Sequence, residues 1–116
     1  MESGYSPVNG VQVYYELHGH ARSGRAPLLL LHGGGDTIGT SFHWIVPELA
    51  KNRQVMALER EGYGRTEDVR NLPFSFEQSA DDTVALLERL GIWHSDFFGF
   101  SNGGRIALES PSVTRR

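Results

Sequence analysis

The sequence predicts a three-layer α/β sandwich with a mostly parallel sheet. Short apolar runs at residues 28–31, 54–60 and 95–100 have the composition of strands that are buried on both faces. Each run is followed by a segment with helical spacing of its apolar residues or with helix-start signals. Strands that alternate with helices in this way need crossover connections, which place parallel strands in one layer and helices in the outer two.

Composition limits the classes of protein that this chain can represent. Its 116 residues carry a net charge of −3 and have no Lys/Arg cluster beyond Arg115 and Arg116, so neither nucleic acid nor anionic membrane is expected as a partner. The absence of cysteine excludes disulfides and thiolate zinc sites. The N-terminus lacks a signal-peptide pattern and the longest aliphatic run, 28–31, is too short to span a bilayer. We therefore expect one soluble, cytoplasmic domain without a metal or cofactor.

The first half of the chain predicts two strands and a helix. Residues 11–19 alternate β-branched and aromatic residues with polar ones, which indicates a strand, and the polar segment 20–27 indicates a turn. The buried strand at 28–31 then runs into glycines. Between residues 40 and 52, apolar side chains recur at helical spacing, with Pro47 expected in the first turn of the regular helix.

The second half predicts two strands and two helices. Residues 54–60 form a strand, and a glycine-rich loop leads to Ser75, which with Gln78 makes a capping box for a helix through Leu90. One face of that helix is expected to be lined by Ala80, Val84 and Leu87. A third buried strand at 95–100 precedes a helix that begins at residue 102.

The pentapeptide Gly99–Gly103, GFSNG, is a G-x-S-x-G motif between that strand and that helix. A tight strand-to-helix turn needs small flanking residues and exposes the central hydroxyl, here that of Ser101, at the carboxyl edge of the sheet. The backbone N–H of Asn102 would open the helix and could donate to an oxyanion. A chance match is the alternative, but few chance matches fall at a strand-to-helix junction.

A second glycine cluster, His32-Gly33-Gly34-Gly35, follows the strand at 28–31. On its own it is better explained as a simple turn at the end of a strand, with His32 packed beside it. Together with the serine motif it is better explained as the other half of an oxyanion hole, because consecutive glycines let backbone N–H groups approach a ligand closely.

These two motifs, and the segment EGYGRT at residues 61–66, make residues 8–109 resemble the α/β-hydrolase family. The resemblance implies the N-terminal half of that fold and an oxyanion hole formed by Gly34, or Gly35, and Asn102. Glu61 stands where the family commonly has an arginine, so the ion pair that the family makes there is not expected.

The resemblance implies that Ser101 is the nucleophile of an acyl hydrolase that acts on a carboxylic ester or a similar small-molecule acyl bond. A serine there disfavours the epoxide hydrolase and haloalkane dehalogenase branches, which have an aspartate. In the family the acid and the histidine of the triad follow the serine along the chain. Here residues 109–116 form a polar tail interrupted by Pro111, which suggests a truncated or frame-shifted half-domain.

All five histidines precede the serine, so a substitute base would break the family's chain order. His32 and His43 are the nearest candidates, and neither is expected to act as the base. Without a base Ser101 is an ordinary alcohol, so we expect little or no turnover. The strand at 95–100 would also lie at the sheet edge and recruit another strand, from a second copy of the chain or from a complementing C-terminal fragment.

Two other functions stay open at this stage. A nucleotide-binding βαβ unit would use Gly33, Gly35 and Gly39 for the phosphates and Glu59 for a ribose hydroxyl, although the glycine spacing departs from the dinucleotide fingerprint. A non-catalytic half-hydrolase retained as a binding or assembly module is the third possibility.

Overall fold

The computed structural model describes residues 1–22, 24–100 and 102–109. The nucleophile candidate Ser101 and the polar tail beyond residue 109 therefore lie outside the described residues. The elements in chain order are β1 (Glu2–Val8), β2 (Val11–His18), β3 (Leu28–Leu31), α1 (Ile38–Phe42), α2 (Val46–Leu49), β4 (Val55–Leu58), α3 (Phe76–Arg89), β5 (Asp96–Gly99) and α4 (Asn102–Glu109).

The described strands form one sheet in the order β1-β2-β4-β3-β5. β3 pairs in parallel with β4 on one side and with β5 on the other. β2 runs antiparallel to both β1 and β4, so the other four strands share one direction. The predicted mostly parallel sheet is confirmed, with β3 in the middle of its parallel part.

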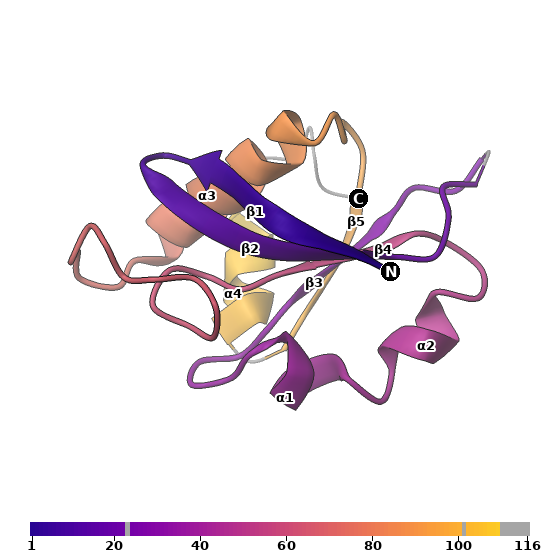
Figure 1. Cartoon of the computed structure of the whole chain (residues 1–116), viewed down its shortest axis with the longest axis horizontal. Coiled ribbons are helices and arrows are strands. Elements are labelled where there is room, and N and C mark those ends of the chain that lie inside the picture. Colours follow the sequence, from indigo (N-terminus) through magenta and orange to yellow (C-terminus); the bar gives the residue numbers. More distant parts are fainter. Residues whose placement is uncertain (23, 101, 110–116) are drawn as a thin grey trace.

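Helices cover both faces of this sheet, as the three-layer prediction requires (Figure 1). α3 and α4 pack on one face, over a core that includes Leu29, Leu31 and Met56. α1 and α2 pack on the other face, over Leu30 and Ala57. Successive residues of β3 thus enter opposite cores, which explains why this strand is apolar at every position.

The predicted helices are present, with differences in detail. Two short helices replace the one expected between residues 40 and 52: α1 begins earlier, at Ile38, and α2 ends at Leu49. Pro47 does lie in the first turn of α2. Ser75 caps α3 by accepting from the Gln78 N–H, but the Gln78 side chain donates to Asp82, so the capping box is only half formed.

The buried face of α3 also differs from the prediction. Ala80 and Leu87 are buried as expected, whereas Val84 is only half-buried. Thr83 and Leu86 are fully buried in its place. α3 lies against both the sheet and α4, and its buried face is therefore wider than one stripe.

The strand β1 was not predicted from the sequence. It pairs with β2 along its whole length, from Glu2 opposite Leu17 to Val8 opposite Val11. Asn9 and Gly10 connect the two strands, and both have positive φ, 49° and 87°. An Asn-Gly pair between two strands favours a tight two-residue hairpin turn, and this was the signal available in the sequence.

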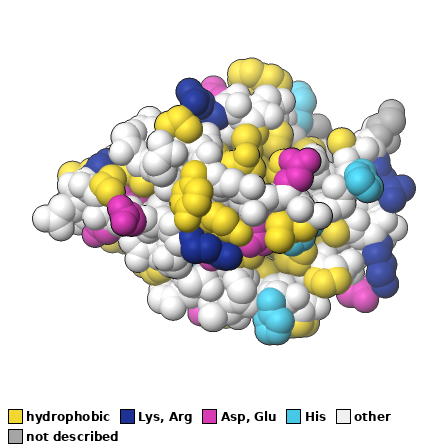
Figure 2. Space-filling model, in the orientation of Figure 1, with side chains coloured by type: hydrophobic (Ala, Val, Ile, Leu, Met, Phe, Trp, Pro, Cys, Tyr) yellow, Lys and Arg dark blue, Asp and Glu magenta, His cyan; other side chains and the backbone are white. Residues whose placement is uncertain are grey.

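On the face shown in Figure 2, the basic side chains are dispersed among acidic and apolar ones. Of the helices that the structure describes, none combines the length and the apolar character needed to cross a bilayer.

Candidate active site

The two glycine-containing motifs leave the sheet at the same edge. β3 and β5 are neighbours and parallel, with Leu31 opposite Gly99, so the loops that follow them begin side by side. Figure 1 shows α4 starting directly beyond this edge. The topology therefore brings together motifs that lie far apart in the sequence.

The turn from β5 into α4 is tight. The Phe100 N–H donates to the Leu31 carbonyl at 3.1 Å, and the Gly103 N–H donates back to the Phe100 carbonyl at 3.0 Å. A side chain at Gly103 would collide with the Leu31 carbonyl, and one at Gly99 would collide with the backbone of Gly103. Both glycines of the motif are thus required by close backbone approach, as expected for a strand-to-helix elbow.

The glycine loop after β3 lies against the start of α4. A Cβ atom placed on Gly34 would come within 2.5 Å of the Asn102 side-chain nitrogen. Asn102 is the first residue of α4, as the sequence predicted. Gly34 and Asn102, two of the three predicted oxyanion donors, are therefore neighbours in space.

Gly35, the alternative donor, has a φ of 77°, and a Cβ atom placed on it would meet no atom within 4 Å. The Asp36 N–H donates to the Gly33 carbonyl at 3.1 Å and so closes the loop. Gly34 is therefore the glycine of this loop that the structure places beside Asn102.

His32 is a structural residue at the end of β3. It is fully buried, its Nε2 accepts from the Arg60 backbone N–H at 3.1 Å, and its Nδ1 lies 2.9 Å from the Gly33 carbonyl. These contacts fit the neutral ring with the proton on Nδ1. Burial lowers the pKa of His32, which also favours the neutral form. Both ring nitrogens are engaged, so His32 is not available as a base for Ser101.

His43, the other candidate base, is exposed at the end of α1. Its Nδ1 lies 2.9 Å from the Gly39 carbonyl, one turn earlier in the same helix. Within the described part of the chain, no hydrogen bond or ion pair links the His43 side chain to Asn102 or to the glycine loop.

Glu59 fixes the loop that follows β4. Its carboxylate is fully buried and accepts from the Ile38 N–H and from the backbone and side chain of Arg65. Burial alone would raise the pKa of Glu59, but these donors outweigh it and hold the pKa below its usual value. A buried and fully engaged carboxylate cannot hold a ribose hydroxyl, which removes the main support for the nucleotide-binding alternative.

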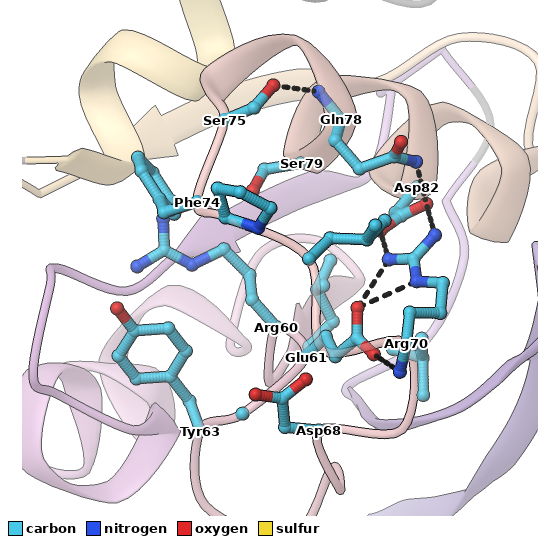
Figure 3. Close-up of a pocket in the computed structure, with 15 residues that line it drawn as sticks. Arg60, Glu61, Tyr63, Asp68, Arg70, Phe74, Ser75, Gln78, Ser79 and Asp82 are labelled. Atoms are coloured by element: carbon cyan, nitrogen blue, oxygen red, sulfur yellow. Dashed lines mark hydrogen bonds and ion pairs between the residues drawn. The ribbon is translucent and has the colours of Figure 1, made fainter.

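Glu61, at the position where the resemblance implied an arginine, makes ion pairs through Arg70. Arg70 lies 2.6 Å from Glu61 and 2.6 Å from Asp82 in α3, so one guanidinium links the loop to the helix (Figure 3). Burial alone would raise the pKa of Glu61. The hydrogen bonds from Arg70 have the larger opposite effect, so the pKa of Glu61 lies below its usual value. The loop is thus anchored here through Arg70.

Arg60 has an unusual environment that the sequence analysis did not anticipate. Only 5% of this residue is exposed, and its Nε and Nη1 have no hydrogen-bond partner in the described part of the chain. The guanidinium lies 5.0 Å from the Tyr63 ring centre and 6.0 Å from that of Phe74. The signal available in the sequence for Arg60 was an arginine just after a buried strand, because residues at the carboxyl end of a parallel strand lie at the edge of the sheet where ligands bind.

The fold and this elbow define an α/β hydrolase. A family model described as alpha/beta hydrolase fold matches residues 26–112, and the chain therefore belongs to this family.

The chain is 36% identical over 84 residues to a 2-hydroxymuconate semialdehyde hydrolase of Pseudomonas sp. (strain CF600), a match that covers 71% of this chain and 30% of the relative. It is 30% identical to a proline iminopeptidase of Clostridioides difficile (strain 630), covering 90% of this chain and 36% of the relative. The chain spans about a third of the length of these curated relatives.

Solved structures agree on the fold. A meta-cleavage product hydrolase from Pseudomonas fluorescens IP01 superimposes with a TM-score of 0.86 at 23% identity, covering 99% of this chain and 42% of that one. An enzyme that degrades N-acyl homoserine lactones gives a TM-score of 0.82 at 25% identity, covering 98% and 42%. The relatives differ in substrate, so membership of the family leaves the substrate of this chain open.

Proposed function

We propose that this chain carries the nucleophile half of a serine acyl hydrolase that acts on a carboxylic ester or a similar acyl bond. The observation that carries the proposal is the adjacency of Gly34 and Asn102 at the carboxyl ends of β3 and β5. In this proposal the Ser101 hydroxyl attacks the substrate carbonyl. The N–H groups of Gly34 and Asn102 then donate to the oxyanion that forms.

The proton of Ser101 needs an acceptor, and neither of the two candidate histidines is available for this role. His32 is buried with both nitrogens engaged, and His43 bonds to its own helix. In an acyl hydrolase of known mechanism, loss of the histidine lowers turnover by about a million-fold. We therefore propose that this stretch alone turns over little, and that activity requires an acid and a histidine supplied from outside it.

The experiment is a complementation. The chain is fused ahead of the corresponding C-terminal part of the Pseudomonas 2-hydroxymuconate semialdehyde hydrolase, and hydrolysis of 4-nitrophenyl acetate is measured for the fusion and for the chain alone. The expected result is a rate well above background in the fusion only. Ser101→Ala should abolish it, while Ser3→Ala, on the exposed start of β1, should not.

Two outcomes would contradict the proposal. A folded fusion that shows no serine-dependent hydrolysis would argue for a non-catalytic module. Efficient hydrolysis by the chain alone, lost on Ser101→Ala, would show that a base is present after all. A cytoplasmic location stays a prediction from the sequence.

A further inference from the structure

The side chain of Asn102 lies against the glycine loop that follows β3. A Cβ atom built on Gly34 would lie 2.5 Å from the Asn102 Nδ2 and 3.4 Å from its Cγ, and its three nearest atoms all belong to Asn102. Gly34 does not have the positive φ that Gly35 has, so this position does not need glycine for a left-handed backbone. The missing side chain of Gly34 instead makes room for the Asn102 amide.

This amide has hydrogen-bonding capacity that the described part of the chain does not use. Within residues 1–22, 24–100 and 102–109, no hydrogen bond links the Asn102 side chain to another residue. Asn102 is half-buried and Gly34 is exposed, so a bound molecule can reach the amide. A partly desolvated N–H group without a partner favours a hydrogen bond to an oxygen of such a molecule.

The amide is also placed where negative charge would need donors. It belongs to Asn102 and contacts Gly34, the two residues whose backbone N–H groups form the proposed oxyanion hole. The loop itself supplies no positive charge there, because burial favours neutral His32 and Asp36, whose carboxylate lies beside Gly33, is an acid. Negative charge on a substrate oxygen must therefore be stabilised by N–H donors, and side-chain amides can serve as such donors.

We propose that the Asn102 side-chain amide is a third oxyanion donor, beside the backbone N–H groups of Gly34 and Asn102. This inference rests on the proposed function, because it needs Ser101 as the nucleophile. In the acyl-transfer step the Ser101 Oγ forms a bond to the carbonyl carbon and its proton passes to solvent. The carbonyl oxygen becomes the oxyanion that the three N–H groups stabilise. The oxyanion then collapses, the leaving group departs with the electron pair of its bond, and an acyl-serine remains.

Acetylation of the full chain by 4-nitrophenyl acetate tests this inference, because it measures acyl transfer and needs no turnover. An oxyanion hole and binding alone still give roughly 10³ to 10⁴ over water when a triad is removed. Mass spectrometry of peptides would follow acetylation of Ser101 relative to that of the exposed Ser3. In the unmodified chain Ser101 should react about a thousandfold faster than Ser3.

Two variants remove the amide from the site and keep both backbone donors. Asn102→Leu replaces it with a good helix former, and Gly34→Ala displaces it by occupying its space. Each should lower the ratio of Ser101 to Ser3 acetylation by about a hundredfold, the effect of losing one oxyanion donor. The double variant should be no slower than Asn102→Leu, because both changes remove the same group. Gln12→Leu, which removes an exposed amide on β2, should leave the ratio unchanged.

The outcomes separate this inference from the proposed function. Acetylation of Ser101 no faster than that of Ser3 in the unmodified chain would overturn both. Fast acetylation that persists in an Asn102→Leu variant, folded by circular dichroism, would overturn the inference alone, because the backbone donors would then be sufficient. A double variant much slower than either single variant would also overturn it, since the two changes would then act on separate groups.

Discussion

At the residue scale, Gly103 is where the elbow tolerates least change. Its missing side chain makes room for the Leu31 carbonyl, which belongs to the neighbouring strand and cannot move aside easily. Gly103→Ala should lower the free energy of unfolding by about 1–3 kcal/mol, the usual cost of overpacking. Urea unfolding followed by circular dichroism would measure it.

Gly104 is the matched control for this substitution. A Cβ atom there would lie 3.4 Å from the Gly99 carbonyl, an ordinary contact. Gly104→Ala should be neutral or stabilise α4 by up to about 1 kcal/mol, because alanine is the better helix former. Equal destabilisation by the two variants would mean that the close approach at Gly103 does not limit the elbow.

His32 makes folding sensitive to pH. Burial lowers its pKa in the folded chain, so between this lowered value and about pH 6.5 the unfolded chain binds a proton that the folded chain does not. Stability from this group is therefore present above about pH 6.5 and is lost as the pH falls toward the folded pKa. His32→Asn should reduce the slope of stability against pH in this window.

The exposed His20 provides the control, since His20→Asn should leave that slope intact. The measurement is urea unfolding at several pH values between 5 and 7.5, a range set by the ordinary histidine pKa of about 6.5. An unchanged slope in a folded His32→Asn variant would contradict the conclusion that burial lowers the pKa of His32.

At the element scale, Arg70 joins the loop after β4 to α3. Its partners Glu61 and Asp82 each have side chains that are 13% exposed, so removing the guanidinium leaves two poorly solvated carboxylates. Arg70→Met should lower the free energy of unfolding by about 1–3 kcal/mol at neutral pH, between the values for surface and buried ion pairs. Thermal unfolding would measure the loss.

The Glu61–Arg70 ion pair also predicts how the stability of the chain changes with pH. The folded pKa of Glu61 is depressed, so its contribution is present above the unfolded value of about 4.5 and is lost as the pH falls through the folded value. The gap between wild type and Arg70→Met should therefore shrink on acidification. Lys51→Met, which breaks the exposed pair with Glu48, should change little at any pH.

The sequence predicted those elements whose local pattern matches their final environment. β3 and β4 are apolar at every position because both faces are covered, and Ser75 marks the start of α3. β1 was missed because residues such as Gly4 and Pro7 weaken its strand pattern, and its pairing with β2 decides its structure.

The site was predictable only in part, for a similar reason. The glycines and Asn102 belong to short motifs, so their roles could be inferred from spacing. Whether the Nε and Nη1 of Arg60 find hydrogen-bond partners depends on which side chains the loop at 61–75 brings near them, and tertiary packing decides this. The Glu61–Arg70–Asp82 network likewise joins residues whose partnership no local pattern reveals.

At the scale of the whole molecule, β5 has a partner on one side only in the described sheet. The N–H groups of Asp96 and Phe100 donate toward the Pro27–Leu31 segment, so the backbone groups of the alternate residues Phe97 and Gly99 face outward. Phe98 beside them is 47% exposed. We propose that this edge recruits a strand from a second copy or from a complementing fragment.

Size-exclusion chromatography with light scattering tests this proposal. The chain should associate in a concentration-dependent way, and Phe98→Lys should shift it toward the monomer, because an edge lysine opposes strand addition. Trp44→Lys, at a position 69% exposed outside the strands, should not have this effect. A monomer at every concentration would contradict the proposal.

The strand order also constrains how the chain can fold as it is synthesised. β4 lies between β2 and β3, which precede it in the sequence but do not pair with each other. Until residues 55–58 have left the ribosome, the β1–β2 hairpin and β3 have no common neighbour to hold them in one sheet. Emergence of β4 is thus the step at which the β1–β2 hairpin and β3 can join one sheet. A pause in translation just before this step would prolong the exposure of the apolar strand Leu28–Leu31 to chaperones and to aggregation.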